Sequence, residues 1–156
     1  MNIWTLNQWK KSKMSNFPKS GLFFRFEKDV HADVRQDLIE FSKWLRTQYE
    51  FPSKVTVYVK STELVRAKDG DLCCGTCFQP FNKEQCVHIK LATGDYETLR
   101  KEWGKDEALN SILLSAATML THYFQWLNDM GELDEAMAIQ QAEENAMVIV
   151  QQYLDG

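Results

Sequence analysis

The sequence lacks any excess of basic residues. Its 18 Lys and Arg are outnumbered by 22 Asp and Glu, which gives a formal net charge of −4. A nucleic-acid-binding domain normally carries a basic patch or stripe, because contacts to phosphates dominate its affinity. We therefore expect no nucleic-acid partner for this chain.

The chain also lacks a long apolar run. Its most apolar stretch, residues 107–129, is interrupted by Ser115, Thr118, His122 and Gln125. A membrane-spanning helix needs roughly 20 consecutive apolar residues. The first twenty residues also lack the apolar segment and small-residue cleavage site of a signal peptide. We expect no membrane span and a cytoplasmic location.

Internal repeats and low-complexity segments are absent as well, which argues against a solenoid or a disordered chain. What remains is an ordinary globular composition, with 156 residues of which 44% are hydrophobic and 26% charged. The length favours one domain with a single core. Residues 1–20 read as an irregular arm that ends at a Pro-Gly turn signal, and residues 21–156 as the domain.

Hydrophobic periodicity predicts an α+β fold. Alternating or short apolar runs indicate strands over residues 22–26, 55–60, 72–78 and 86–92. A period of 3.6 indicates helices over residues 31–49, 96–103, 107–129 and 133–154, with Asp29 or Asp33 capping the first of these and Asp106 the third. We expect a small, mostly antiparallel sheet covered on one face by an N-terminal helix, a buried central helix and a C-terminal helix.

The central helix, residues 107–129, is apolar almost all round and carries one narrow polar stripe. A helix of this kind should be buried, so the stripe must face partners or a wet cleft. Its apolar neighbours Met119, Phe124 and Trp126 are interpreted as core residues. The stripe spans roughly 80° of arc at 100° per residue and comprises Ser111, Ser115, Thr118, His122, Gln125 and Asp129.

Residues 120–126 (LTHYFQW) resemble the second half of the HExxH helix of small bacterial zincin-like metallopeptidases of the gluzincin type. In that family the pattern would run His-Glu-Leu-Thr-His-Tyr-Phe-Gln-Trp. The resemblance implies a zincin-like fold and a central helix that carries the zinc site. It extends over roughly residues 20–154, through the segments at 51–52, 57–60, 69–70, 75–76 and 89–96.

The motif is degenerate in this chain. Thr118 occupies the position of the first histidine and Met119 that of the glutamate, so only His122 is retained. Catalytic zinc usually has three protein ligands and one open position for water. Methionine cannot act as the general base, whose contribution is about 10² to 10⁴. The resemblance therefore implies a domain that has lost zinc binding and peptide hydrolysis, with no cofactor and no catalytic residue, retained as a binding or structural module for an unknown peptide or protein.

A third ligand would come from a later helix in this family. Glu135 and Glu143 on the last predicted helix are the candidates, which leaves open an active zinc metallopeptidase with rearranged ligands. The alternative is that these acids are partly buried and bonded to the polar stripe. His122 could likewise be a core histidine with Ser, Thr or Glu partners.

All four cysteines, Cys73, Cys74, Cys77 and Cys86, lie in one short segment. Cys74 and Cys77 form a CxxC, and Cys86 and His88 follow after a turn. This spacing suits a closed structural zinc site across a hairpin, a redox pair, or cysteines that merely fill strand positions. Cys86 and His88 are also possible substitutes for the missing ligands of the central helix. Strand alternation, however, puts Cys74 and Cys77 on opposite faces.

Overall fold

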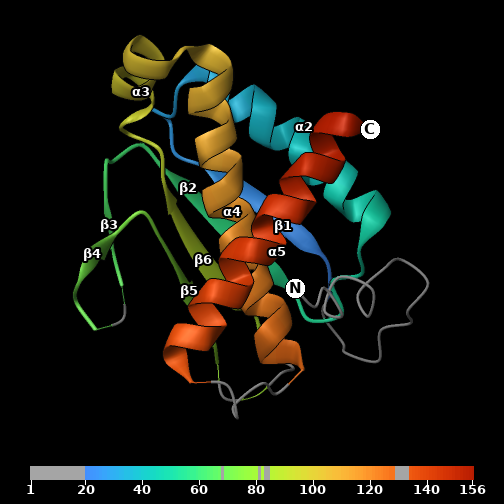
Figure 1. Ribbon diagram of the computed structural model, residues 1–156. Helices are drawn as coiled ribbons and strands as arrows, with labels where there is room; N and C mark the ends of the chain where they lie inside the picture. Colours follow the sequence, from blue (N-terminus) through green and yellow to red (C-terminus); the bar gives the residue numbers. More distant parts are fainter. Residues whose placement is uncertain (1–19, 68, 81, 83–84, 129–133) are drawn as a thin grey trace.

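The computed structural model describes residues 20–67, 69–80, 82, 85–128 and 134–156 (Figure 1). The predicted N-terminal arm, except for Ser20, lies outside these ranges, as does Asp129. The α+β class is confirmed. The elements are β1 (Leu22–Phe26), α2 (Ala32–Gln48), β2 (Val55–Lys60), β3 (Val65–Arg66), β4 (Leu72–Cys73), β5 (Gly75–Phe78), β6 (Val87–Ala92), α3 (Tyr96–Trp103), α4 (Lys105–Leu127) and α5 (Glu135–Asp155).

The main sheet has the strand order β1-β2-β6-β5. β1 pairs with β2 and β2 with β6 in parallel, whereas β5 pairs with β6 antiparallel. The prediction of a mostly antiparallel sheet is therefore wrong. Helix α2 carries the chain back to the end of the sheet at which β1 began, so that β2 runs in the same direction. The segment between β2 and β6 returns the chain in the same way.

One face of the sheet is buried under α2 and α4, as predicted, whereas the last helix, α5, packs mainly on α4 and not, as predicted, on the sheet. Side chains on the other face, such as Arg25 and His88, are exposed. The strict alternation along β2 and β6 produces this difference, because successive side chains of a strand point to opposite faces. The fully buried side chains of these two strands are Val55, Val57, Val59, Val87, Ile89 and Leu91.

Helix α2 begins after His31, and not after Asp29 or Asp33 as predicted. The Nδ1 atom of His31 accepts a hydrogen bond of 3.0 Å from the main-chain N–H of Asp33. An imidazole nitrogen therefore takes the place of the carboxylate that was expected to cap the helix. The predicted apolar face of α2 is buried and includes Val34, Leu38, Phe41 and Leu45.

Gly104 ends α3 and directly precedes α4. Its φ of +92° lies in the region that side chains rarely adopt, which is why a glycine can turn the chain between two contiguous helices. No side chain caps the start of α4, so the predicted cap at Asp106 is wrong. Asp106 lies in the first turn instead, where a carboxylate interacts favourably with the helix dipole.

Helix α4 is the centre of the molecule. It lies against β5 and β6 and also contacts α2, α3 and α5 (Figure 1). Leu113, Leu120 and Phe124 are almost completely buried, and burying each such side chain contributes about 1.5–3 kcal/mol. No helix in the described part of the chain is long and apolar enough to cross a membrane.

Helix α5 packs along α4 through small and branched side chains. Ala142, Ala146 and Val150 are buried, as predicted, and the two alanines allow the helices to approach closely. Ile139 was expected on this face but is 44% exposed. Asp134 caps the start of the helix, and its side chain accepts a hydrogen bond of 2.8 Å from the N–H of Met137.

The predicted strand over residues 72–78 is divided between two sheets. β4 pairs with β3 in a small hairpin, while β5 joins the main sheet at its edge. The break falls at Cys74, whose carbonyl accepts a hydrogen bond of 2.8 Å from the N–H of Ala92. The turn at the end of β6 packs directly on residues 61–63. The contact is so close that a Cβ added to Gly94 would lie 2.5 Å from the carbonyl oxygen of Ser61.

Candidate functional site

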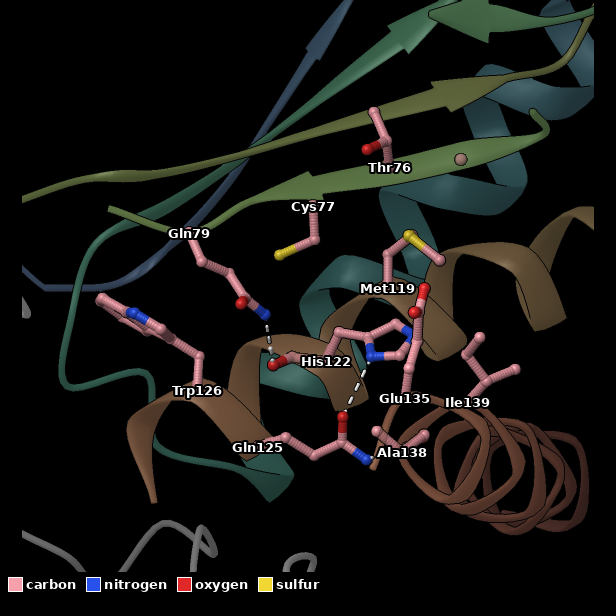
Figure 2. A pocket seen from close by; sticks show the side chains of 11 residues that line it. Thr76, Cys77, Gln79, Met119, His122, Gln125, Trp126, Glu135, Ala138 and Ile139 are labelled. Carbon is pink, nitrogen blue, oxygen red and sulfur yellow. Dashed lines mark hydrogen bonds between the residues drawn. The ribbon is translucent and has the colours of Figure 1, made fainter. Parts of the chain in front are cut away.

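A pocket of about 560 Å³ lies between β5, the C-terminal half of α4 and the start of α5. Figure 2 shows His122 on α4 below the strand, with Glu135 and Ile139 approaching from α5. The pocket is therefore built where the degenerate motif meets the edge of the sheet. Its lining comprises Gly75, Thr76, Cys77, Gln79, Met119, His122, Gln125, Trp126, Glu135, Ala138 and Ile139.

His122 is held in one orientation by Gln125. The distance from His122 Nδ1 to Gln125 Oε1 is 3.0 Å, and Gln125 Nε2 donates to the carbonyl of Ala138 at 3.0 Å and to Gln141 Oε1 at 3.2 Å. A carbonyl can only accept, so the amide nitrogen of Gln125 must face Ala138 and its oxygen must face His122. The neutral imidazole therefore carries its proton on Nδ1 and its lone pair on Nε2.

The surroundings of His122 favour its neutral form. Burial lowers its pKa from the ordinary value of 6.5, while the hydrogen bond to Gln125 and the charge of Glu143 act in the opposite direction without reversing the shift. A neutral ring with Nδ1–H bonded to an oxygen acceptor is the state in which histidine binds metals through Nε2. His122 is thus in a form that can bind a metal through Nε2.

Thr118 and Met119, which the resemblance aligns with the histidine and glutamate of HExxH, lie in different surroundings. Met119 lines the pocket beside His122, and its Cγ would lie 3.1 Å from a Cβ added to Gly75, so α4 and β5 are in close contact there. Thr118 is not among the lining residues, and its hydroxyl donates to the carbonyl of Leu114 one turn earlier at 2.8 Å. Neither side chain supplies a general base or a metal ligand of the zincin type.

The two candidate third ligands are separated by two turns of α5. Glu135 is exposed and lines the pocket together with His122. Glu143 is also exposed, and it contributes to the electrostatic surroundings of His122 without lining the pocket. Glu135 is therefore the better placed of the two carboxylates.

Zinc, the metal that the resemblance implies, does not fit the residues present. In the described part of the chain no three His, Cys, Asp or Glu side chains come close enough to hold a metal ion. One imidazole and one nearby carboxylate fall short of the three ligands of a catalytic zinc site. The polar stripe does not supply another ligand.

The cysteine cluster is not brought together by the fold. Cys77 pairs with Ile89, and Phe78 with His88, so Cys77 and His88 lie on opposite faces of the sheet. Cys77 lines the pocket, His88 stacks on Tyr58 with ring centroids 5.6 Å apart, and Cys74 is exposed at the break between β4 and β5. Cys86, half-buried, precedes β6.

Burial raises the pKa of Cys77 to about 12, although a hydrogen bond from Gln79 acts in the opposite direction. The thiol is therefore protonated at neutral pH. Since the thiolate is the nucleophilic form, Cys77 is poorly suited to nucleophilic or redox chemistry.

Only some of the residues predicted to line a cleft lie at this pocket. Gln125 lines the pocket, whereas Ser111 and Ser115 do not. The hydroxyl of Ser115 donates to the carbonyl of Ser111 at 3.3 Å, within the same helix. A serine or threonine in a helix can satisfy its hydroxyl in this way, so a polar stripe does not by itself mark a cleft.

Several lining residues were not predicted to line a cleft, among them Met119, Trp126 and Gln79. Met119 and Trp126 were interpreted as core, and Gln79 was not singled out, yet all three line the pocket. Gln79 Nε2 donates to the carbonyl of His122 at 3.1 Å, and Trp126 Nε1 donates to the carbonyl of Pro80 at 2.9 Å. These bonds fasten the segment after β5 to α4. The sequence offered one indication that these residues line a pocket: Trp126, one helical turn after His122, has an amphipathic side chain.

Among the described residues, β5 is an edge strand of the main sheet, and it adjoins the pocket. Because the N–H of Ala92 bonds the carbonyl of Cys74, residues 74 and 92 form a hydrogen-bonded pair of the antiparallel ladder. Such pairs alternate with pairs whose main-chain groups point outward. The N–H and C=O groups of Gly75 and Cys77 therefore point away from β6, toward the edge of the sheet.

Comparisons of the chain with protein families, with curated protein sequences and with solved structures each gave no significant match.

Proposed function

We propose that this chain is a zincin-like domain that binds an extended peptide or protein segment in its pocket, without zinc and without hydrolysing the peptide. The observation that carries the proposal is the pocket itself. It lies between an edge strand and the helix that resembles a zincin active-site helix, with His122 in place and Met119 where the family has its general base.

Two features of the fold support the zincin-like part of the proposal. The helix with the LTHYFQW segment, α4, is buried and lies against the edge strand β5. The following helix, α5, brings Glu135 to the same pocket, as the resemblance implies for a third ligand. His122 also keeps the Nδ1–H tautomer of a metal-binding histidine. These features support descent from a zinc enzyme, while Thr118 and Met119 argue against its activity.

The edge strand supports the choice of an extended segment as the ligand. A peptide that adds a strand to a sheet gains main-chain hydrogen bonds, and pockets for its alternate side chains provide specificity. The main-chain groups of Cys77 point outward for such pairing, as does the carbonyl of Gly75, whose N–H bonds the thiol of Cys73. Trp126 and Ile139 supply apolar walls for a side chain of the bound segment.

A zinc hydrolase with rearranged ligands is the second candidate. Only the position of Glu135 favours it, since this carboxylate lines the pocket with His122. A structural zinc module is not favoured, because Cys77 and His88 lie on opposite faces of the sheet.

Peptide binding can be tested with the purified chain and a library of random peptides displayed on phage, in buffer that contains EDTA. The affinity of a selected peptide is then measured for the wild type and for Ile139→Glu, which places a charge in the pocket wall. We expect the affinity to fall by about tenfold or more, equivalent to about 1.4 kcal/mol. The matched control is Met147→Glu on the same helix, which is 63% exposed and outside the pocket.

Equal affinities of the two variants would contradict binding in this pocket. Hydrogen exchange provides a second readout, because a peptide strand paired with β5 should slow exchange at the main-chain N–H of Cys77. Incubation of the selected peptide with the chain and added zinc tests the hydrolase alternative. Cleavage that is abolished by both His122→Ala and Glu135→Gln would overturn the proposal in favour of an active enzyme.

A further inference from the structure

Two sulfur atoms and one imidazole lie in the same pocket. Cys77 comes from β5, and Met119 and His122 come from successive turns of α4; all three line the pocket. Figure 2 shows Cys77 extending from the strand and Met119 from the helix into the space between them. Once the Cys77 thiol has lost its proton to a bound metal, it forms a soft ligand set with the thioether and the imidazole.

We propose that Cys77, Met119 and His122 form a binding site for monovalent copper, Cu(I). Thiolate and thioether ligands favour Cu(I), and imidazole binds copper as well. Zinc, by contrast, is bound by thiolates, imidazoles and carboxylates, and a thioether is not among its usual ligands. The replacement of the general base by methionine thus changes which metal the pocket suits.

Two contacts tie β5 and the segment that follows it to the turn of α4 that carries Met119 and His122. The Sδ atom of Met119 would lie 3.5 Å from a Cβ added to Gly75, two residues before Cys77 on the same face of β5. The Gln79 amide hydrogen-bonds the thiol of Cys77 and donates to the main-chain carbonyl of His122. The absence of a side chain at Gly75 is what lets the thioether reach the strand.

The orientation of His122 favours a metal in the pocket. Its Nδ1–H is bonded to Gln125, which leaves the lone pair on Nε2 for a ligand bond. The carboxylate of Glu135, which also lines the pocket, favours a cation electrostatically. Met119 is flexible, with three rotatable side-chain bonds, so its sulfur can adjust to the metal without moving the helix.

Binding is a ligand exchange without a change of oxidation state. The S–H bond of Cys77 breaks, an S–Cu bond forms, and the proton passes to solvent. Nε2 of His122 and Sδ of Met119 each donate a lone pair. The copper arrives and remains as Cu(I). The site shares the pocket of the proposed peptide-binding function, but it stands on its own ligands and does not require that any peptide binds.

The first test is anaerobic titration with Cu(I) in competition with the chromophoric chelator bicinchoninate. Because surface thiols also bind Cu(I), the host protein carries Cys73→Ser, Cys74→Ser and Cys86→Ser. We expect one Cu(I) per chain in this host and none at comparable affinity after Cys77→Ser.

Ligand variants in the same host then test the other two groups. Met119→Leu and His122→Leu should each weaken binding by about tenfold or more. Met147→Leu, an exposed methionine outside the pocket, should leave it unchanged. Met119→Leu nearly conserves volume, so its effect is not expected to arise from misfolding. Unchanged affinity in Met119→Leu or His122→Leu would overturn the three-ligand site.

A second test uses the wild-type chain and does not depend on any variant. Methionine methyl groups labelled with ¹³C are followed by NMR while Cu(I) is added. The methyl signal of Met119 should shift with the first equivalent and that of Met147 should not. Failure of the Met119 signal to shift would overturn the proposal, while peptide binding in EDTA would remain unaffected. The two proposals can therefore fail separately.

Discussion

Replacing Gln125 with leucine would remove the side chain that ties His122 to α5. Gln125 makes hydrogen bonds of 3.0, 3.0 and 3.2 Å to His122, Ala138 and Gln141. At about 1 kcal/mol net for each bond, about 3 kcal/mol is lost, and burial of the leucine side chain offsets about 1 kcal/mol. We expect the free energy of unfolding to fall by about 2 kcal/mol, and Tm by about 4–8 °C for a domain of this size.

The same substitution should change how stability depends on pH. Burial lowers the pKa of His122, and the bond to Gln125 raises it, so Gln125→Leu should lower this pKa further. The unfolded chain then binds the proton more readily than the folded chain. Stability is therefore complete above 6.5 and falls as the pH drops from 6.5 to the folded pKa. In Gln125→Leu this loss should continue to lower pH than in the wild type.

Urea denaturation at several pH values measures both effects, and ¹⁵N NMR of the imidazole identifies the tautomer and the pKa. The control is Gln140→Leu, an exposed position on α5 that should change stability by no more than about 0.5 kcal/mol. The reasoning is refuted if neutral His122 carries its proton on Nε2. It is also refuted if Gln125→Leu raises the pKa or leaves the free energy of unfolding unchanged.

Two further substitutions test the packing around the site by the same urea method. Gly94→Ala should cost about 3 kcal/mol or more, because the new Cβ meets the main chain of residues 61–63, which cannot rotate away. Gly70→Ala is the control, because Gly70 has a φ of +93° and a Cβ added there would meet no atom within 4 Å. Backbone strain alone should then lower the free energy of unfolding by about 1–2 kcal/mol. If Gly94→Ala lowers it by no more than Gly70→Ala does, the packing of Gly94 against residues 61–63 is contradicted. Tyr123→Phe should cost about 1–3 kcal/mol, because the buried hydroxyl accepts from the N–H of Ser53 at 3.1 Å and donates to its carbonyl. A loss below about 0.5 kcal/mol would show that this bridge is not important.

Periodicity predicted the helices and strands well, because the face of an element that is buried determines which of its residues are apolar. The alternation in Val55–Lys60 and the spacing of Val34, Leu38 and Leu45 both reflect one face turned to the core. Strand direction depends on the path of the connections, and the order β1-β2-β6-β5 cannot be read from alternation. The 17-residue helix between β1 and β2 was nevertheless a usable signal for a parallel pair.

The sequence singled out pocket residues that lie on the helices, but it did not show which residues at the edge of the sheet reach the pocket. His122 and Gln125 were singled out because they share a helix face, and Glu135 because it follows on the next helix. Gln79 was not singled out, and Cys77 was considered only as a member of the cysteine cluster; the register of β5 against β6 brings both to the pocket. The division of residues 72–78 between two sheets fixes that register, and no local pattern indicates such a division.

Zinc content tests the central claim most directly. The wild type, His122→Ala and the double variant Thr118→His with Met119→Glu would be purified, dialysed against zinc and analysed by mass spectrometry. If the chain is a zincin-like domain that has lost its zinc ligands, the wild type should hold far less than one zinc ion per chain. The double variant should hold close to one zinc ion per chain, and adding His122→Ala to the double variant should remove that zinc. One zinc per wild-type chain that His122→Ala removes, or a folded double variant that stays free of metal, would contradict it.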